Sequence, residues 1–135
     1  MDKLFKLEIV TPDKKFFDDE VSMIVINTEM GKIGVLKNHA PMMFAVTPGM
    51  IKIRKVDEDR KAFVSEGFME VNNNVVTLMV DAAEWPEDID VNRALQAKLR
   101  AEERLKRKLA DKEYMNSKAA LLRAIERIKT TKKSI

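Results

Sequence analysis

The sequence predicts an α+β protein, in which an N-terminal antiparallel β-sandwich over residues 1–84 precedes a C-terminal antiparallel two-helix hairpin over residues 88–135. Three observations support this division. Apolar and polar residues alternate in the first part, which is the pattern of half-buried strands. All four glycines and three of the four prolines lie before residue 70, where they separate short segments by turns. From residue 88 onward there is no glycine or proline, and strong helix formers dominate.

Four segments carry the strand pattern. KLFKLEIV (3–10) places an apolar residue at every second position near its centre, and GMIKIRKV (49–56) does the same. VSMIVIN (21–27) is a mostly apolar run rich in β-branched residues. FMEVNNNVVTLMV (68–80) contains two such runs separated by Asn72–Asn74, which predicts a hairpin turn because asparagine tolerates positive φ.

The helical part begins after Pro86, and either Asp88 or Asp90 can serve as the N-cap residue. Small and apolar side chains then recur at spacings of three and four, which indicates one packed face of a helix. They are Ala94, Ala97, Ala101, Leu105 and Leu109. Alanines on this face would let a partner helix approach closely.

We expect the helix to break within ADKEYMN (110–116), and a second apolar face to follow the break. The residues of that face are Met115, Ala119, Leu122, Ile125 or Glu126, and Lys129, with Leu121, Ala124 and Ile128 widening it. The break contains no glycine or proline, so one long helix also fits the composition. A weakly specified break would permit both a folded and an extended form of the hairpin.

The composition excludes several kinds of site. Cysteine is absent, which excludes disulfides, a thiolate nucleophile and cysteine-based zinc sites. His39 is the only histidine, so histidine-rich metal sites are excluded and no metal site is predicted. No acid and nucleophile accompany His39 nearby, so we predict no catalytic residue. No apolar run reaches the roughly 18 residues that a membrane-spanning helix needs.

The net charge of +3 divides unevenly along the chain. Residues 88–135 contain 14 Lys and Arg and 7 Asp and Glu, which gives +7; residues 1–87 contain the other 11 and 15, which gives −4. A basic segment attached to an acidic one indicates that the helices meet an anionic partner. Nucleic acid, a phosphate ligand, an acidic protein surface and anionic lipid all satisfy that condition.

Three stretches, taken in order, resemble one family. GKIGVLKNHAPMM (31–43) resembles the Gly-x-x-Gly…His-Ala-Pro loop of the epsilon subunit of F-type ATP synthases. SEGFMEVNNNVVTLMVDAAE (65–84) resembles that family's Gly-Phe-x-Glu-Val…Asp-x-Ala-Glu segment. IDVNRA (89–94) resembles the Ile/Leu-Asp-x-x-Arg-Ala signature of its ATP-binding bacterial members. The resemblance covers essentially the whole chain.

The resemblance implies a ten-stranded sandwich followed by a two-helix hairpin, in a non-catalytic rotor subunit. The sandwich would bind the gamma subunit and the c-ring, which couples ion translocation to ATP synthesis. The helices would permit ATP hydrolysis when folded against the sandwich. Extended along gamma, they would reach acidic segments of the catalytic alpha/beta head and inhibit it. The implied location is the cytoplasmic side of the bacterial cell membrane, as a peripheral part of the complex.

In ATP-binding members of this family, ATP, with or without Mg²⁺, is a regulatory ligand that stabilises the folded-down helices without being turned over. The resemblance assigns ATP binding here to eight positions. They are Glu84, Ile89, Asp90, Arg93, Ala94, Arg100, Arg123 and Arg127.

The arginine positions also have a physical rationale. Arg123 and Arg127 are four residues apart on a helix, so both point to one face and can clamp phosphates through charge-assisted hydrogen bonds. Arg93 and Arg100 are about two turns apart and share a face in the same way. If the helices fold as a hairpin, the four arginines could converge.

Simpler interpretations of the same residues stay open at this point. Asp90 or Glu84 can accept a hydrogen bond from an adenine amino group, but Asp90 can equally be a plain N-cap. Arg123 and Arg127 can equally belong to a solvated basic face. His39 either shapes its loop or faces the c-ring. Trp85, before Pro86, either pins the hairpin to the sandwich or is an exposed linker aromatic.

Two other function classes compete with a rotor subunit. One is an adaptor whose basic helical hairpin binds nucleic acid or another anionic partner. Against it, the helices hold no aromatic residue beyond Tyr114, and their basic residues surround the apolar face without forming one dense patch. The other is a carboxylate-based hydrolase, but no spacing singles out a catalytic pair. No Gly-x-x-x-x-Gly-Lys-Ser/Thr loop supports a P-loop nucleotidase.

Overall fold

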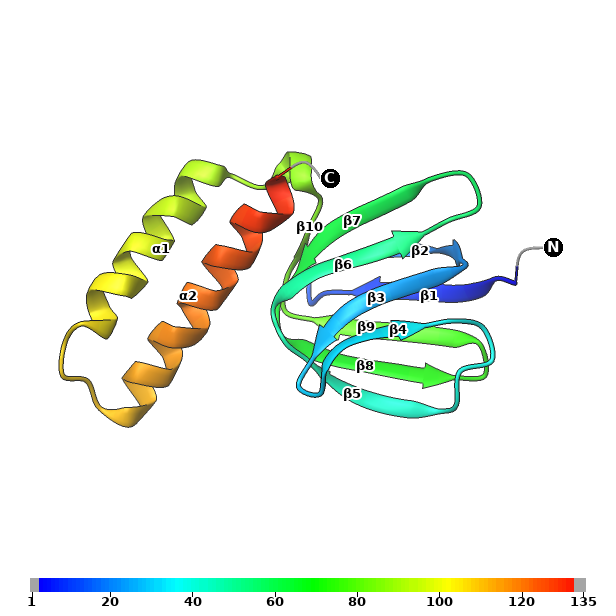
Figure 1. Cartoon of the computed structure of the whole chain (residues 1–135), viewed down its shortest axis with the longest axis horizontal. Coiled ribbons are helices and arrows are strands. Elements are labelled where there is room, and N and C mark those ends of the chain that lie inside the picture. Colours follow the sequence, from blue (N-terminus) through cyan, green and yellow to red (C-terminus); the bar gives the residue numbers. More distant parts are fainter. Residues whose placement is uncertain (1–2, 133–135) are drawn as a thin grey trace.

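The computed structural model describes residues 3–132 as a β-sandwich with two α-helices packed beside one of its ends (Figure 1). This arrangement confirms the α+β fold and the ten strands implied by the resemblance. The strands are β1 (Phe5–Val10), β2 (Lys15–Val21), β3 (Met23–Thr28), β4 (Gly31–Val35), β5 (Met42–Val46), β6 (Gly49–Arg54), β7 (Asp59–Val64), β8 (Gly67–Asn72), β9 (Val75–Val80) and β10 (Ala83–Glu84). The short 3₁₀ helix η1 (Pro86–Asp88) then leads into α1 (Val91–Leu105) and α2 (Asp111–Thr131).

The strands form one hydrogen-bonded path in the order β10-β7-β6-β3-β5-β8-β9-β1-β2, and β4 pairs with β3 outside this path. Strands β1 and β9 run parallel, which departs from the purely antiparallel sheet that the sequence predicts. They come from opposite ends of the sandwich sequence, so no tight turn joins them and requires the antiparallel direction. The other strand pairs of the described residues are antiparallel.

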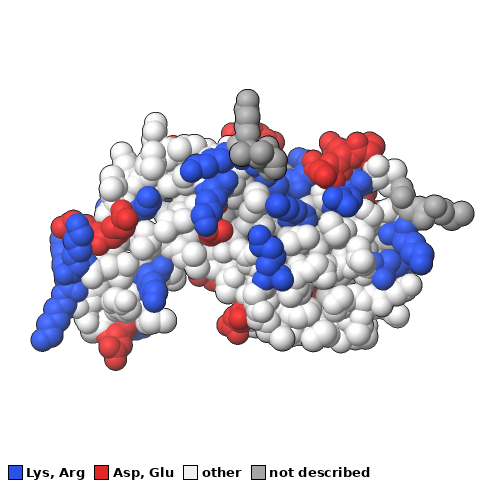
Figure 2. Space-filling model, in the orientation of Figure 1, with Lys and Arg blue, Asp and Glu red and all other residues white. Residues whose placement is uncertain are grey.

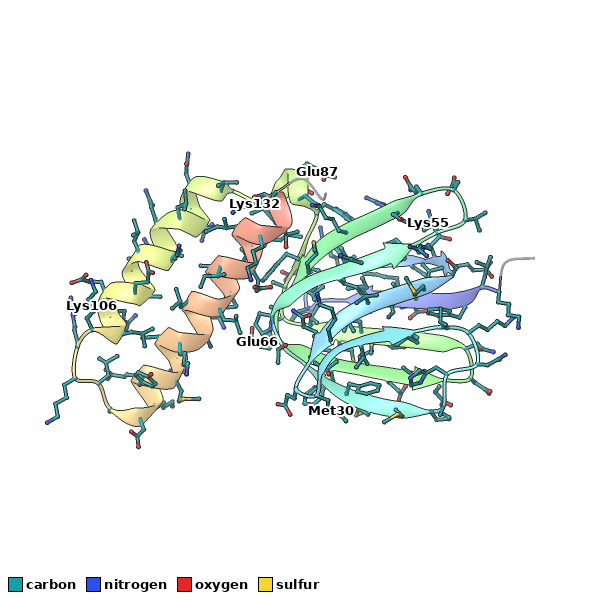
Figure 3. The ribbon with its side chains drawn as sticks, viewed as in Figure 1. Met30, Lys55, Glu66, Glu87, Lys106 and Lys132 are labelled. Carbon is teal, nitrogen blue, oxygen red and sulfur yellow. The ribbon has the colours of Figure 1, made fainter. Side chains whose placement is uncertain are left out.

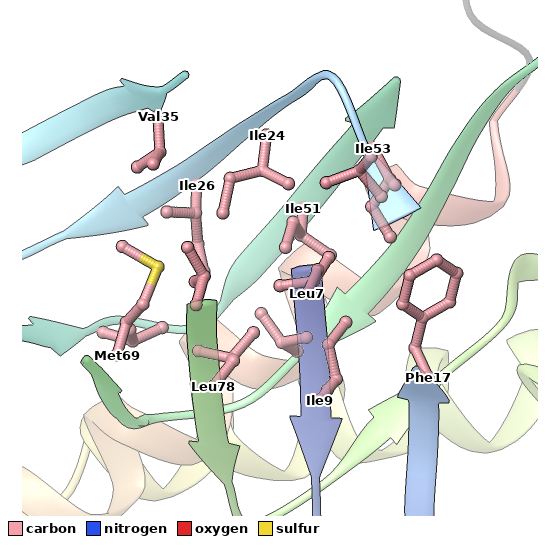
Figure 4. Close-up of a cluster of buried hydrophobic side chains, with 14 of the residues drawn as sticks. Leu7, Ile9, Phe17, Ile24, Ile26, Val35, Ile51, Ile53, Met69 and Leu78 are labelled. Atoms are coloured by element: carbon pink, nitrogen blue, oxygen red, sulfur yellow. The ribbon is translucent and has the colours of Figure 1, made fainter. Parts of the chain in front are cut away.

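The alternation in the sequence determines which side chains form the core. Leu7 and Ile9 of β1 are fully buried, as are Ile51 and Ile53 of β6, which lie across the core from them (Figure 4). Each such side chain contributes about 1.5–3 kcal/mol by its burial. The core cluster draws its buried residues from positions 5–80 and none from the two helices. The sandwich therefore has a hydrophobic core of its own.

Side chains bridge the two ends of the strand path, where β2 and the β7–β10 edge are not joined by backbone hydrogen bonds. The Lys55 ammonium lies 2.9 Å from the Asp19 carboxylate of β2. This hydrogen bond, helped by one from the backbone N–H of Glu20, lowers the pKa of Asp19. Next to it, Trp85 stacks on Phe16 of β2 with ring centroids 4.5 Å apart. Trp85 thus pins the start of the hairpin to the sandwich, which decides between the two alternatives for this residue.

Turn chemistry explains the β8–β9 hairpin, which the structure confirms. Asn73 and Asn74 adopt positive φ angles of 55° and 63°, which asparagine tolerates better than most residues. Gly67, at the start of β8, is required for space: a Cβ there would lie 1.9 Å from the Met79 carbonyl oxygen. The residue patterns alone did not predict β2, β4, β5, β7 or β10. For example, β2 carries three consecutive exposed acidic side chains, and β4 contains two glycines.

The helix break lies earlier than the predicted 110–116. Helix α1 ends at Leu105, a link covers 106–110, and α2 begins at Asp111. The expected breaking segment is therefore the first turn and a half of α2. Asp111 and Glu113 lie in that first turn, where negative charge favours a helix start through the macrodipole.

The predicted face of α1 is correct, but that of α2 is only partly so. Ala94 and Ala101 of α1 are buried, whereas Met115 and Leu122 of α2 are 62% and 40% exposed. The buried residues of α2 are Ser117, Ala124, Glu126 and Thr130, of which Ala124 and Glu126 belong to the predicted face. Helix α2 contacts α1 on one side and strands β6 and β7 on another, so it buries side chains on two of its faces. A single apolar stripe therefore does not predict which of its residues are buried. Within residues 3–132, no helix is both long and apolar enough to cross a membrane.

Candidate functional site

The surface between α2 and the sandwich contains two arginine–glutamate pairs. In the first, the Nε of Arg127 lies 2.5 Å from Oε1 of Glu84, the last residue of β10. The guanidinium of Arg127 also lies over the ring of Phe63, 4.5 Å from its centroid. The two charged side chains are only 28% and 31% exposed, so solvent screens this pair less than an ordinary surface pair.

The second pair lies further toward the start of α2. Nη1 of Arg123 donates a hydrogen bond of 2.9 Å to Oε2 of Glu66, which follows β7 and lies at the end of the sandwich nearest α2 (Figure 3). The other carboxylate oxygen, Oε1 of Glu66, is shielded from solvent and has no hydrogen-bond partner among the described residues. Glu66 is therefore held by one charged contact and is not fully satisfied.

A groove of about 340 Å³ lies between the two helices. It is lined by Ala97, Arg100, Ala101, Arg104, Glu113, Asn116, Ser117, Ala120 and Arg123. The Ser117 side chain is buried, and its hydroxyl oxygen has no partner among the described residues. Alanines widen the groove, and arginines from both helices make it positively charged. This donor set suits an anion such as a phosphate group.

The signature residues 89–94 shape the start of α1. Oδ1 of Asp90 accepts a hydrogen bond of 3.1 Å from the backbone N–H of Arg93, so Asp90, and not Asp88, is the N-cap residue. Ile89 and Ala94 are 7% and 5% exposed and help to pack the junction. The Arg93 side chain is exposed. Capping occupies one oxygen of the Asp90 carboxylate. A role of this carboxylate in ATP binding stays a prediction.

The structure thus brings together only some of the predicted ATP-binding residues. Arg100 and Arg123 line one groove, and Arg127 is paired with Glu84 beside it. Arg93 does not line that groove, so the four arginines do not converge in this arrangement. Among the described residues, no group of three or more His, Cys, Asp or Glu side chains could hold a metal ion.

Sequence reasoning missed Glu66 and Ser117. Glu66 lies 57 positions from its partner Arg123, and no local spacing connects the two. Ser117 directly follows the segment 110–116 that was assigned to the helix break, and the predicted second face did not include it. Only the register of α2 against α1 places this hydroxyl in the groove.

Comparison with known proteins identifies the family. The family model for the β-sandwich domain of the ATP synthase delta/epsilon chain matches residues 4–86, and the model for its long α-helix domain matches residues 87–132. The chain belongs to the ATP synthase delta/epsilon chain family. A curated ATP synthase epsilon chain from Caldanaerobacter subterraneus is 46% identical over 134 residues, covering 98% of this chain and 97% of the relative.

Two solved structures share the fold. A chain of the Euglena gracilis mitochondrial ATP synthase matches with a TM-score of 0.79 at 22% identity, covering 91% of this chain and 78% of that one. A chain of the Tetrahymena thermophila mitochondrial ATP synthase central stalk and c-ring matches with a TM-score of 0.69 at 15% identity, covering 97% and 98%. Members of the epsilon family are non-catalytic subunits, and this chain is not an enzyme in itself.

The family assignment also weighs against a nucleic-acid adaptor. In Figure 2, lysines and arginines are spread over the visible face of both the helices and the sandwich, with acidic residues between them. A nucleic-acid-binding surface concentrates positive charge on one face to follow the phosphate backbone. Two basic residues of α2, Arg123 and Arg127, instead meet carboxylates of the same chain at Glu66 and Glu84.

Proposed function

We propose that this chain is the central-stalk, or rotor, subunit of a bacterial F-type ATP synthase. Its sandwich binds the gamma subunit and the c-ring, and so takes part in coupling ion translocation to ATP synthesis. Its two helices are a regulatory arm that permits ATP hydrolysis when docked on the sandwich. Extended along gamma to the alpha/beta head, the arm inhibits hydrolysis. The chain acts at the cytoplasmic side of the membrane as a peripheral part of the complex.

The polar character of the surface between α2 and the sandwich carries this proposal. The sandwich core closes without the helices, and α2 docks through the pairs of Arg123 with Glu66 and Arg127 with Glu84. Buried polar residues, Glu126 and Thr130, lie on the same helix. Polar interfaces of this kind between parts of one chain favour relative movement, whereas large apolar ones resist it. An arm that docks in this way can undock while the main core cluster of the sandwich stays closed, and the apolar side chain that it uncovers is Phe63, under Arg127.

ATP is the ligand that we assign to the arm. Arg100 and Arg123 line a groove shared by the two helices, so phosphate groups bound there would hold both helices together. Arg127 lies one turn further along α2, and Ser117 offers an unpaired hydroxyl donor. Ligand at about 100 times its Kd would stabilise the docked arm by about 2.7 kcal/mol. That free energy exceeds the contribution expected of one ion pair at this interface, so ATP can decide the position of the arm.

The gamma subunit would bind an exposed apolar surface on the outer face of strands β5, β8 and β9. Met43 of β5, Phe68 of β8 and Met79 of β9 are 60%, 56% and 46% exposed and belong to one face of neighbouring strands. The lower right of Figure 2, where β5 and β8 lie, shows few charged residues. Contiguous exposed apolar surface marks protein interfaces. By resemblance, the loop that follows Gly31 is the segment expected to meet the c-ring, and Lys32 stands there where the family often carries a carboxylate.

The ligand assignment is tested by calorimetric titration of the full chain with Mg-ATP. We expect saturable one-to-one binding that is lost in Asp90→Ala and in the double variant Arg123→Ala/Arg127→Ala. Arg107→Ala/Lys108→Ala, which removes two exposed basic side chains in the link between the helices, is the charge-matched control for the double variant and should bind as the unchanged chain does. Absence of heat up to millimolar ATP would remove the nucleotide-sensing role and leave Asp90 as a helix cap.

A further inference from the structure

Glu66 is placed against α2 by a rigid turn of the sandwich. The backbone N–H of Ser65 donates to the Ala82 carbonyl at 2.9 Å, and the N–H of Ala82 donates back to the Ser65 hydroxyl at 2.7 Å. The N–H of Asp81 donates to the carbonyl of Glu66 itself. Glycine is required at the adjacent position 67, because a Cβ there would clash with the neighbouring backbone. The carboxylate of Glu66 is therefore presented from a fixed position.

Arg123 lies between a carboxylate of the sandwich and the basic interhelical groove. Its Nη1 donates to Glu66, while the same side chain lines the interhelical groove with Arg100 and Arg104. A guanidinium has five N–H donors in a planar fork, and a carboxylate and a phosphate group recognise the same fork. The charge of Glu66 neutralises the arginine that the groove would offer to a phosphate.

The pair itself is poorly satisfied, so a better acceptor can displace it. Only Oε2 of Glu66 has a hydrogen bond, whereas Oε1 is shielded from solvent and has no partner among the described residues. A bidentate arginine–carboxylate contact would satisfy both oxygens and bind more strongly. A phosphate group, with more acceptor oxygens and more charge, can replace Glu66 at Arg123.

We infer that Glu66 is an internal competitor for the phosphate groups of ATP: it holds Arg123 when nucleotide is scarce and lowers the affinity of the arm for ATP. This inference rests on the proposed function of the groove. Glu66 then has two linked effects. It stabilises the docked arm without nucleotide, and it raises the ATP concentration needed to occupy the site.

Competition makes a specific thermodynamic prediction. The pair stabilises the docked arm without nucleotide but is broken in the docked arm with ATP. Removing its charge therefore leaves the ATP-bound form unchanged and destabilises only the nucleotide-free docked form, so ATP binds more tightly. If Glu66 instead positioned Arg123 in both forms, removing it would leave the affinity unchanged or weaken it.

The test compares Glu66→Gln with Glu70→Gln, a control that removes the same charge from an exposed position of β8. Calorimetry with Mg-ATP gives the affinity. Spin labels on Val56→Cys and Lys112→Cys, both at exposed positions of a chain without natural cysteine, report arm docking by double electron–electron resonance. We expect Glu66→Gln to bind ATP about two- to fivefold more tightly and to lower the docked-to-undocked ratio without nucleotide by the same factor. Glu70→Gln should change neither quantity.

The other outcomes distinguish a failure of the Glu66 competition from a failure of the proposed ATP site. If the unchanged chain binds ATP and Glu66→Gln has equal or weaker affinity, competition is excluded and the ATP site stands. If the arm of the unchanged chain is undocked without nucleotide, Glu66 does not hold it and the inference fails. If the unchanged chain does not bind ATP at all, both the proposed ligand and the competition are refuted.

Discussion

Arg127→Ala is the most direct perturbation of the docked arm. The substitution removes the contact between Arg127 and Glu84, which are 2.5 Å apart, and the guanidinium packed over Phe63. It leaves the sandwich core intact, because that core contains no residue of either helix. The expected result is an arm that undocks more readily from a sandwich that is still folded.

The magnitude follows from the two contacts. A hydrogen bond between charged groups contributes about 1.5–3 kcal/mol, and the low end applies because both side chains retain about 30% exposure. A cation–π contact that is not fully desolvated contributes about 0.5–1 kcal/mol. The docked arm should therefore lose about 2 kcal/mol relative to the undocked arm. That loss lowers the docked-to-undocked ratio about thirtyfold.

The assay is double electron–electron resonance on spin labels at Val56→Cys and Lys112→Cys, since the chain has no other cysteine. Arg127→Ala should broaden the single label-to-label distance of the docked arm, and Arg107→Ala should not. Circular dichroism checks that both variants keep their strands. Equal behaviour of Arg127→Ala and Arg107→Ala would refute the view that this ion pair docks the arm.

Three further predictions concern the sandwich. Gly67→Ala should destabilise the fold by about 3 kcal/mol in urea unfolding, because its Cβ would lie 1.9 Å from a backbone carbonyl oxygen that must then move; an unchanged midpoint would contradict this. Phe68→Asp should leave the melting temperature unchanged but prevent co-purification with a gamma subunit, whereas the exposed Val56→Asp should not; retained co-purification would place the gamma surface elsewhere. The hydrogen bond from Lys55 lowers the pKa of Asp19 below its ordinary value of 3.8, so this pair stabilises the fold fully above that pH. Its contribution is lost as the pH falls through the lowered pKa, and Asp19→Asn should show a smaller loss of stability in that acid range than the unchanged chain.

Much of the fold could be predicted from short-range patterns. Alternation identified β1 and β6, an apolar run rich in β-branched residues identified β3, and the asparagine turn identified the β8–β9 hairpin. The helix break could not be placed, because it contains no residue that stops a helix. Its position depends on how α1 and α2 pair and on the acidic first turn of α2.

The candidate site was less accessible to sequence reasoning. The positions of Arg123 and Arg127 on one helix face followed from their spacing, but their partners Glu66 and Glu84 come from other elements. Arg93 was expected to join the other arginines, and the crossing of the two helices leaves it exposed instead. Spacing along one helix cannot determine which face a second helix covers.

The sequence by itself determined the two-part organisation, the strand alternation, the alanine face of α1 and the basic charge of the arm. These properties depend on neighbours within a few residues, where chain geometry fixes which side chains share a face. Only the tertiary structure decided that both arginines of α2 meet carboxylates of the sandwich and that Ser117 lies in the interhelical groove. Such contacts join residues 43 and 57 positions apart, and their geometry depends on how whole elements pack.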